Sequence, residues 1–134
     1  MRATWGALDI DVAVGWRATA HPECLTLAAS GSGAFQLSSA RKGAGEITLA
    51  ELRHFYQPTL PPNASFGDAH FANFRGFVGQ FMDAGVLWRK YWLACRNVMA
   101  FATYNGDTEA WKRRREEVES MLNSLRIVPS KDES

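Results

Sequence analysis

Alternation of apolar and polar residues predicts three strands in the first third of the chain. Residues 7–14 alternate with period two, which places the aliphatic side chains on one face and both carboxylates on the other. The polar stretch 15–23 is expected to end this strand. Two short apolar runs, 24–30 and 34–41, follow, and the glycine-containing segment between them predicts a hairpin.

A capping box predicts the first helix. Thr48 stands where an N-cap residue would, Glu51 follows three residues later, and Ile47 and Leu52 can form a hydrophobic staple. The pattern predicts a helix over 49–57 that ends before a proline, followed by a proline-containing loop. The side expected to be buried consists of Leu49, Leu52, Phe55 and Tyr56.

Turn signals at intervals of about ten residues indicate a meander of antiparallel hairpins between residues 66 and 104. Strands are predicted at 66–73, 76–82, 86–95 and 98–104. A helix over 86–102 is the alternative, and it is disfavoured because the segment is rich in aromatic and β-branched residues.

The last element is predicted to be a helix capped by Asp107. Its apolar residues fall on one stripe with a period of 3.6, namely Trp111, Val118, Met121, Leu122 and Leu125. With 134 residues the chain has the size of one domain, predicted over 1–128, and residues 129–134 are expected to form a polar C-terminal tail.

Composition excludes several classes of partner. Apolar residues make up 46% of the chain, charged residues 22%, and the net charge is +1. The charge balance gives little attraction to nucleic acid or anionic lipid. No apolar run reaches the roughly 18 residues of a membrane span, and no secretion signal is recognised. We therefore expect a cytoplasmic protein that binds neither nucleic acid nor membrane.

Histidines and cysteines show no metal-ligand spacing. His21, His54 and His70 lie far apart, and Cys24 and Cys95 stand singly, so neither a metal site nor another cofactor is predicted. The two cysteines are expected to be reduced and buried rather than joined in a disulfide. His54 is expected on the helix surface.

Basic residues offer several candidate contacts. Arg41 and Lys42, before a glycine pair, are candidates to hold an anion, although a simple turn is the favoured interpretation. The run 112–115 is followed by glutamates at helical spacing, which favours a solvated helix face. Arg114 falls within the apolar stripe, so it is expected to extend over the sheet edge or to pair with a carboxylate from another element.

Two strands of the predicted meander carry the remaining candidates. Asp68 and His70 share a face of their strand and are candidates for acid–base chemistry, weighed against an ordinary solvent-facing surface. In the segment 88–92, alternation places Lys90 on one face and Arg89 on the other. Most of the rings in this segment are expected in the core, with these two cations accessible.

The order of elements and several motifs resemble the PsbP-like and DcrB-like family of α/β/α sandwiches. The motifs that carry the resemblance are Phe35–Lys42, Gly45–Thr48, Phe77–Gly79, Trp88–Leu93 and Thr103–Asn105. The resemblance implies an α+β fold in which an antiparallel sheet of about six to seven strands lies between helices. It also implies a binding module rather than an enzyme.

The leading hypothesis is a small non-catalytic protein that binds another protein. An immunity protein against a secreted bacterial toxin, or a chaperone of a type VI secretion effector, fits the resemblance. The alternative is a small enzyme or ligand-binding domain with a pocket between sheet and helix, built on Asp68, His70 and Arg89. A third hypothesis is nucleic-acid binding through residues 113–115. The candidate protein-binding residues are Arg41, Lys42, Asp68, His70, Arg89, Lys90 and Arg114.

Overall fold

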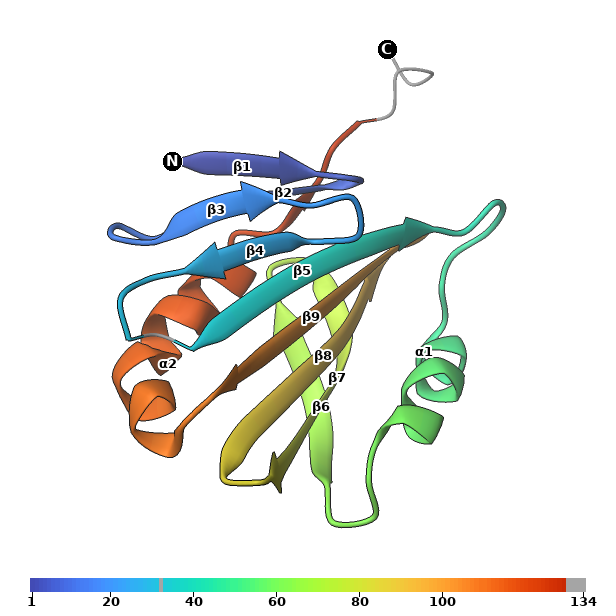
Figure 1. Cartoon of the computed structure of the whole chain (residues 1–134). Helices are drawn as coiled ribbons and strands as arrows, with labels where there is room; N and C mark the ends of the chain where they lie inside the picture. The colour runs from blue at the N-terminus through green and yellow to red at the C-terminus, as the bar shows by residue number, and fades with distance from the viewer. Residues whose placement is uncertain (32, 130–134) are drawn as a thin grey trace.

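A large antiparallel sheet forms the body of the molecule (Figure 1). The computed structural model describes residues 1–31 and 33–129. Within these residues seven strands make up the sheet, in the order β3-β4-β5-β9-β8-β7-β6. The strands are β3 (Arg17–Ala20), β4 (Leu25–Ala28), β5 (Ala34–Arg41), β6 (Ser65–Phe71), β7 (Phe74–Asp83), β8 (Val86–Cys95) and β9 (Val98–Gly106). The fold is therefore α+β, with a seven-stranded antiparallel sheet and two helices.

A second, small sheet joins the two ends of the chain. It contains β1 (Arg2–Trp5), β2 (Leu8–Asp11) and β10 (Arg126–Ile127), in the order β1-β2-β10. β10 pairs antiparallel with β2 immediately after the C-terminal helix. Residues more than 110 positions apart in the sequence therefore share one ladder.

The two helices lie against opposite faces of the large sheet (Figure 1). α2 (Thr108–Leu122) and the small sheet cover one face, and their apolar side chains join those of β4, β5, β8 and β9 in the main core. α1 (Leu49–Tyr56), which continues into the 3-10 turn η1 (Gln57–Thr59), covers part of the other face. There Leu52 and Tyr56 pack on Phe77, Trp92 and Ala94 in a second, smaller cluster.

Both predicted helix caps are confirmed. The Thr48 N–H donates to Glu51 Oε1 and the Glu51 N–H donates to Thr48 Oγ1, each at 3.1 Å, which is the reciprocal pattern of a capping box. Asp107 Oδ1 accepts from the Ala110 N–H at 2.6 Å and caps α2. The buried side of α1 is narrower than predicted, because Leu49 is 43% and Phe55 57% exposed.

The hairpin prediction for residues 66–104 is also confirmed, with four strands in a continuous antiparallel meander. The turn between β7 and β8 consists of Ala84 and Gly85, both with positive φ, as hairpins with two-residue turns require. This turn sets the register that places Phe81 opposite Trp88.

Strand prediction was wrong at the N-terminus and incomplete at the C-terminus. The strand expected over 7–14 is the shorter β2, while β1, β3 and β10 were not predicted. The stretch 15–23, expected to be irregular, contains β3, whose four residues lie at the edge of the sheet. Of the predicted tail 129–134, residues 130–134 lie outside the described part of the chain.

Candidate binding face

The face of the large sheet that carries α1 is only partly covered by this helix. Alternation and register place further side chains on it, seven of which we call the aromatic face: Gln36, Ser38, Phe81, Trp88, Lys90, Phe101 and Thr103. All are half-buried except the exposed Gln36. Phe101 also packs against the small cluster under α1. Four strands contribute to this surface, so its shape is held by backbone hydrogen bonds rather than by a loop.

A stacked pair of rings with a cation forms the centre of the aromatic face. Phe81 and Trp88 lie nearly parallel, with 6.2 Å between ring centroids and 5° between planes. Lys90 Nζ lies 5.7 Å from the Phe81 centroid and 5.9 Å from the Trp88 centroid, within cation–π range. Lys90 forms no ion pair with any described residue. The arrangement offers apolar area and one uncompensated positive charge.

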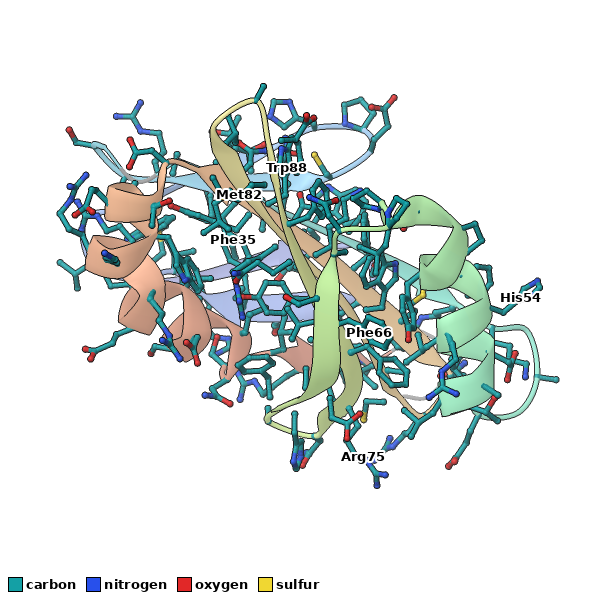
Figure 2. The ribbon with its side chains drawn as sticks, turned by 90° about the horizontal axis from the view of Figure 1, so that it is seen from below. Phe35, His54, Phe66, Arg75, Met82 and Trp88 are labelled. Atoms are coloured by element: carbon teal, nitrogen blue, oxygen red, sulfur yellow. The ribbon has the colours of Figure 1, made fainter. Side chains whose placement is uncertain are left out.

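Shallow hollows border the aromatic face. One of about 620 Å³ lies between the loop after α1 and the end of β7, lined by Pro58, Thr59, Leu60, Pro61, Asn63, Phe81, Met82 and Asp83. Another of about 170 Å³ includes Glu23, Cys24, Gln36, Ser38, Phe101 and Thr103. In Figure 2, Trp88 and Met82 lie near the end of the β7–β8 hairpin, and register places them on opposite faces of the sheet. Because the hollows beside it are shallow, the aromatic face suits contact with an extended surface of a partner.

Arg89 belongs to the opposite face and has a structural role. Its Nε donates to the Tyr91 hydroxyl at 2.9 Å, Nη1 donates to Gln80 Oε1, and its guanidinium lies 4.7 Å from the centroid of the Trp111 ring. Burial raises the pKa of Tyr91, so this hydroxyl stays neutral at ordinary pH. Arg89 is half-buried and links β8 to α2 through these contacts, and its predicted role as a contact residue stays a prediction.

Arg114 is also held by structural contacts. Its Nη1 lies 2.8 Å from Glu117 Oε1 and its Nη2 donates to the Ser30 carbonyl oxygen at 3.0 Å. The prediction left two alternatives open, extension over the sheet edge or a carboxylate from another element; the carboxylate that Arg114 pairs with, Glu117, lies on the same helix. The Trp16 Nε1–H donates to Glu117 Oε2 at 2.7 Å. Hydrogen bonds from Arg114 and Trp16 lower the pKa of Glu117.

The other basic residues of the run 112–115 contact acidic side chains or a backbone carbonyl oxygen. Lys112 pairs with Glu109 at 3.5 Å, and Arg115 pairs with Glu119 at 2.7 Å. Arg113 donates to the Gly31 carbonyl oxygen at 3.4 Å. These contacts agree with the predicted solvated helix face and divide the basic surface that nucleic-acid binding would need.

Arg41 and Lys42 hold chain segments in place. Arg41 Nη2 donates to the Val128 carbonyl oxygen at 2.8 Å. Lys42 Nζ lies 2.9 Å from Glu51 Oε1 and 3.2 Å from the Glu46 carbonyl oxygen, so it ties the loop before α1 to the capping box. The Lys42 ammonium lowers the pKa of Glu51.

Asp68 and His70 are exposed on β6, at the edge of the sheet. With Arg75 they line a hollow of about 230 Å³ beside the start of α1. Arg89 lies on the other face, so the group of Asp68, His70 and Arg89 expected for an enzyme pocket is not brought together.

The cysteines and histidines form no common site in the described residues. Cys24 and Cys95 are both free, as predicted, and both are half-buried rather than fully buried. His54 points away from the sheet on the outer side of α1 (Figure 2). No group of three His, Cys, Asp or Glu side chains within residues 1–31 and 33–129 could hold a metal ion. No helix in this part of the chain is long and apolar enough to cross a membrane.

Comparison with known proteins identifies the fold. No protein-family model and no curated protein matches the chain. A crystal structure of a protein from Bacteroides thetaiotaomicron matches 92% of this chain with a TM-score of 0.67 and 10% sequence identity. This chain covers 46% of that protein, so it spans about half of its length. At this identity the similarity shows a shared fold and carries no activity across.

Of the seven predicted contact residues, only Lys90 lies on the aromatic face. Phe81, Phe101, Gln36 and Thr103 were not predicted as surface residues. Alternation assigns the residues of each strand to two faces. Which faces of neighbouring strands coincide follows only from the register, which the two-residue turn after Asp83 fixes between β7 and β8.

Proposed function

We propose that this protein is a non-catalytic module that binds another protein through the aromatic face. The observation that carries the proposal is the parallel pair of Phe81 and Trp88 with Lys90 beside it, all half-buried on the open part of the sheet. Aromatic side chains supply much of the energy of protein interfaces because they bury large areas with few rotatable bonds. The shallow hollows beside these rings favour a macromolecular partner, since small-molecule sites enclose most of their ligand.

The resemblance to PsbP-like and DcrB-like sandwiches supports a more specific assignment within this proposal. That group includes immunity proteins against secreted toxins and chaperones of type VI secretion effectors, and the resemblance implies a binding module without chemistry of its own. The net charge of +1 favours a partner other than a strongly basic nuclease, whose inhibitors are acidic to match it. The partner side of the interface should carry a carboxylate near Lys90.

The test is affinity measurement with variants of the aromatic face. A partner captured from the source organism is purified, and its Kd is measured for the wild type and for W88A, F101A and K90E. We expect each variant to weaken binding at least about tenfold, which corresponds to about 1.4 kcal/mol. Phe55→Ala is the matched control, because Phe55 is 57% exposed but lies on α1, outside the face. Unchanged affinity in the three variants would exclude this face as the binding surface.

A small-ligand function is the second candidate, and one hollow favours it. A space of about 160 Å³ lies between the sheet and α1, lined by Ala40, Arg41, Lys42, Ile47, Glu51, Phe55 and Met99. Its apolar lining suits a small hydrophobic molecule. Met99→Trp would fill the space, so a ligand that protects the wild type but not this variant against thermal unfolding would support the second candidate.

A further inference from the structure

The outer edge of β6 is an unprotected edge of the large sheet. β6 is the last strand in the order, and Ser65, Phe66, Gly67, Asp68 and His70 are exposed. Within the described residues, the β6 backbone makes hydrogen bonds to β7 and to no other element. Every second residue of an edge strand directs its N–H and C=O outward. β6 contains neither lysine nor proline, the residues that most often block such an edge.

The side chains of β6 are complementary to a second copy of the same strand. When two antiparallel copies of β6 are related by a two-fold axis perpendicular to the sheet, the same face of each copy lies on the same side of the joined sheet. With the axis at Ala69, Asp68 of each copy stands opposite His70 of the other, and Gly67 stands opposite Phe71. Both carboxylate–imidazole pairs then lie on one face, where each can share a hydrogen bond, and directly opposite side chains interact most strongly.

The two neighbouring registers place identical polar side chains opposite each other. An axis at Asp68 places the two Asp68 carboxylates directly opposite each other, and an axis at His70 does the same with the two imidazoles. The axis at Ala69 also brings Asp68 toward Arg75, which stands beside His70 on β7. Of these three registers, only the one centred on Ala69 pairs unlike polar side chains.

We propose that this chain forms a dimer through antiparallel pairing of β6 with β6, centred on Ala69, which joins two sheets into one. The pairing covers only residues 67–71 of each copy, so it buries less than the roughly 800 Å² per partner of a standard interface. The dimer is therefore weak and depends on protein concentration. Phe66, which is 61% exposed, borders the paired segment. The proposal does not depend on the aromatic face, whose side chains come from β5, β7, β8 and β9.

The first experiment is charge exchange, followed by sedimentation velocity over a concentration series. D68R removes the carboxylate and sets a guanidinium opposite the imidazole at both pairs, and H70D sets two carboxylates opposite each other there, so each variant alone should raise the Kd of the dimer at least tenfold. An equimolar mixture of D68R and H70D sets a guanidinium opposite a carboxylate at one pair, keeps the native carboxylate–imidazole pair at the other, and should form a heterodimer. Both positions are exposed, so circular dichroism of each variant should match that of the wild type.

The second experiment is oxidative cross-linking. A69C brings two sulfurs to directly opposite positions, where Cα atoms of antiparallel strands lie about 4.5–5.5 Å apart, within the range of a disulfide. G67C, two residues along, is the matched control and should not form a cross-linked dimer, since its two copies lie about 13 Å apart along the strand. Wild-type protein, with its own two cysteines, gives the background.

Three results would overturn the proposal. They are a monomer at all concentrations up to about 1 mM, a dimer that D68R leaves unchanged, and equal cross-linking of A69C and G67C. The first would leave β6 free for a strand of another protein, and the others would place the dimer interface elsewhere. W88A should dimerise as the wild type does, which separates this result from the test of the aromatic face.

Discussion

Replacing Tyr56 with phenylalanine is expected to stabilise the protein, the opposite of what most core substitutions do. Tyr56 is 1% exposed, and its ring packs 5.0 Å from Phe77 and 5.2 Å from Trp92 between centroids. Its hydroxyl is buried and has no hydrogen-bond partner among the described residues. The folded state therefore carries the cost of removing this hydroxyl from water without a compensating bond.

The magnitude follows from that cost. A buried polar group without a partner destabilises by about 1–3 kcal/mol, whereas the ring contacts are nearly the same in phenylalanine. We expect Y56F to raise the free energy of unfolding by about 1 kcal/mol, equivalent to roughly 3–5 °C in Tm for a domain of this size.

Tyr91→Phe is the matched control. Tyr91 is also fully buried, but its hydroxyl accepts a hydrogen bond from Arg89 Nε at 2.9 Å. Removing it leaves the guanidinium without this acceptor and should cost about 1–2 kcal/mol. The two variants delete the same atom from the same residue type, so opposite signs isolate the effect of the hydrogen bond.

Urea unfolding followed by tryptophan fluorescence measures both variants, with the m-value as a check that each unfolds as the wild type does. If Y56F is destabilised by as much as Y91F, the Tyr56 hydroxyl has a partner in solution and the reasoning fails.

Three further predictions concern single residues. Because Arg114 lowers the folded-state pKa of Glu117, this carboxylate stabilises the protein above its usual pKa, and the contribution is lost as the pH falls through the lowered value. E117Q should be less stable than the wild type at pH 7, and the difference should shrink as the pH falls below the usual range of a glutamate. T48A removes one bond of the capping box and should cost about 1 kcal/mol in urea unfolding. At Gly76 a Cβ would lie 1.9 Å from a backbone oxygen of β8, so G76A should lose about 3 kcal/mol, whereas G67A, with open space at its Cβ, should unfold nearly as the wild type.

The elements with a strong local signal could be predicted from the sequence. Thr48 and Asp107 cap their helices through contacts within three residues, and the meander turns depend on adjacent residues such as Ala84 and Gly85. β1, β3 and β10 have two to four residues each, too few for alternation to distinguish them from loop. β10 pairs with β2 across more than 110 residues, a partnership that no local pattern encodes.

Candidate site residues were harder to predict, because a side chain's role depends on what lies opposite it. Charge and alternation correctly placed Lys90 and Arg89 on different faces, but not what each side chain contacts. That was decided by the packing of α2, which places Trp111 over Arg89, and by α1, which stops short of Lys90. The sequence by itself determined the helix caps, the hairpin turns and the alternation of faces, since these depend on neighbours along the chain. Tertiary structure alone decided which face stayed open, since covering a face requires contacts between segments that are distant in sequence.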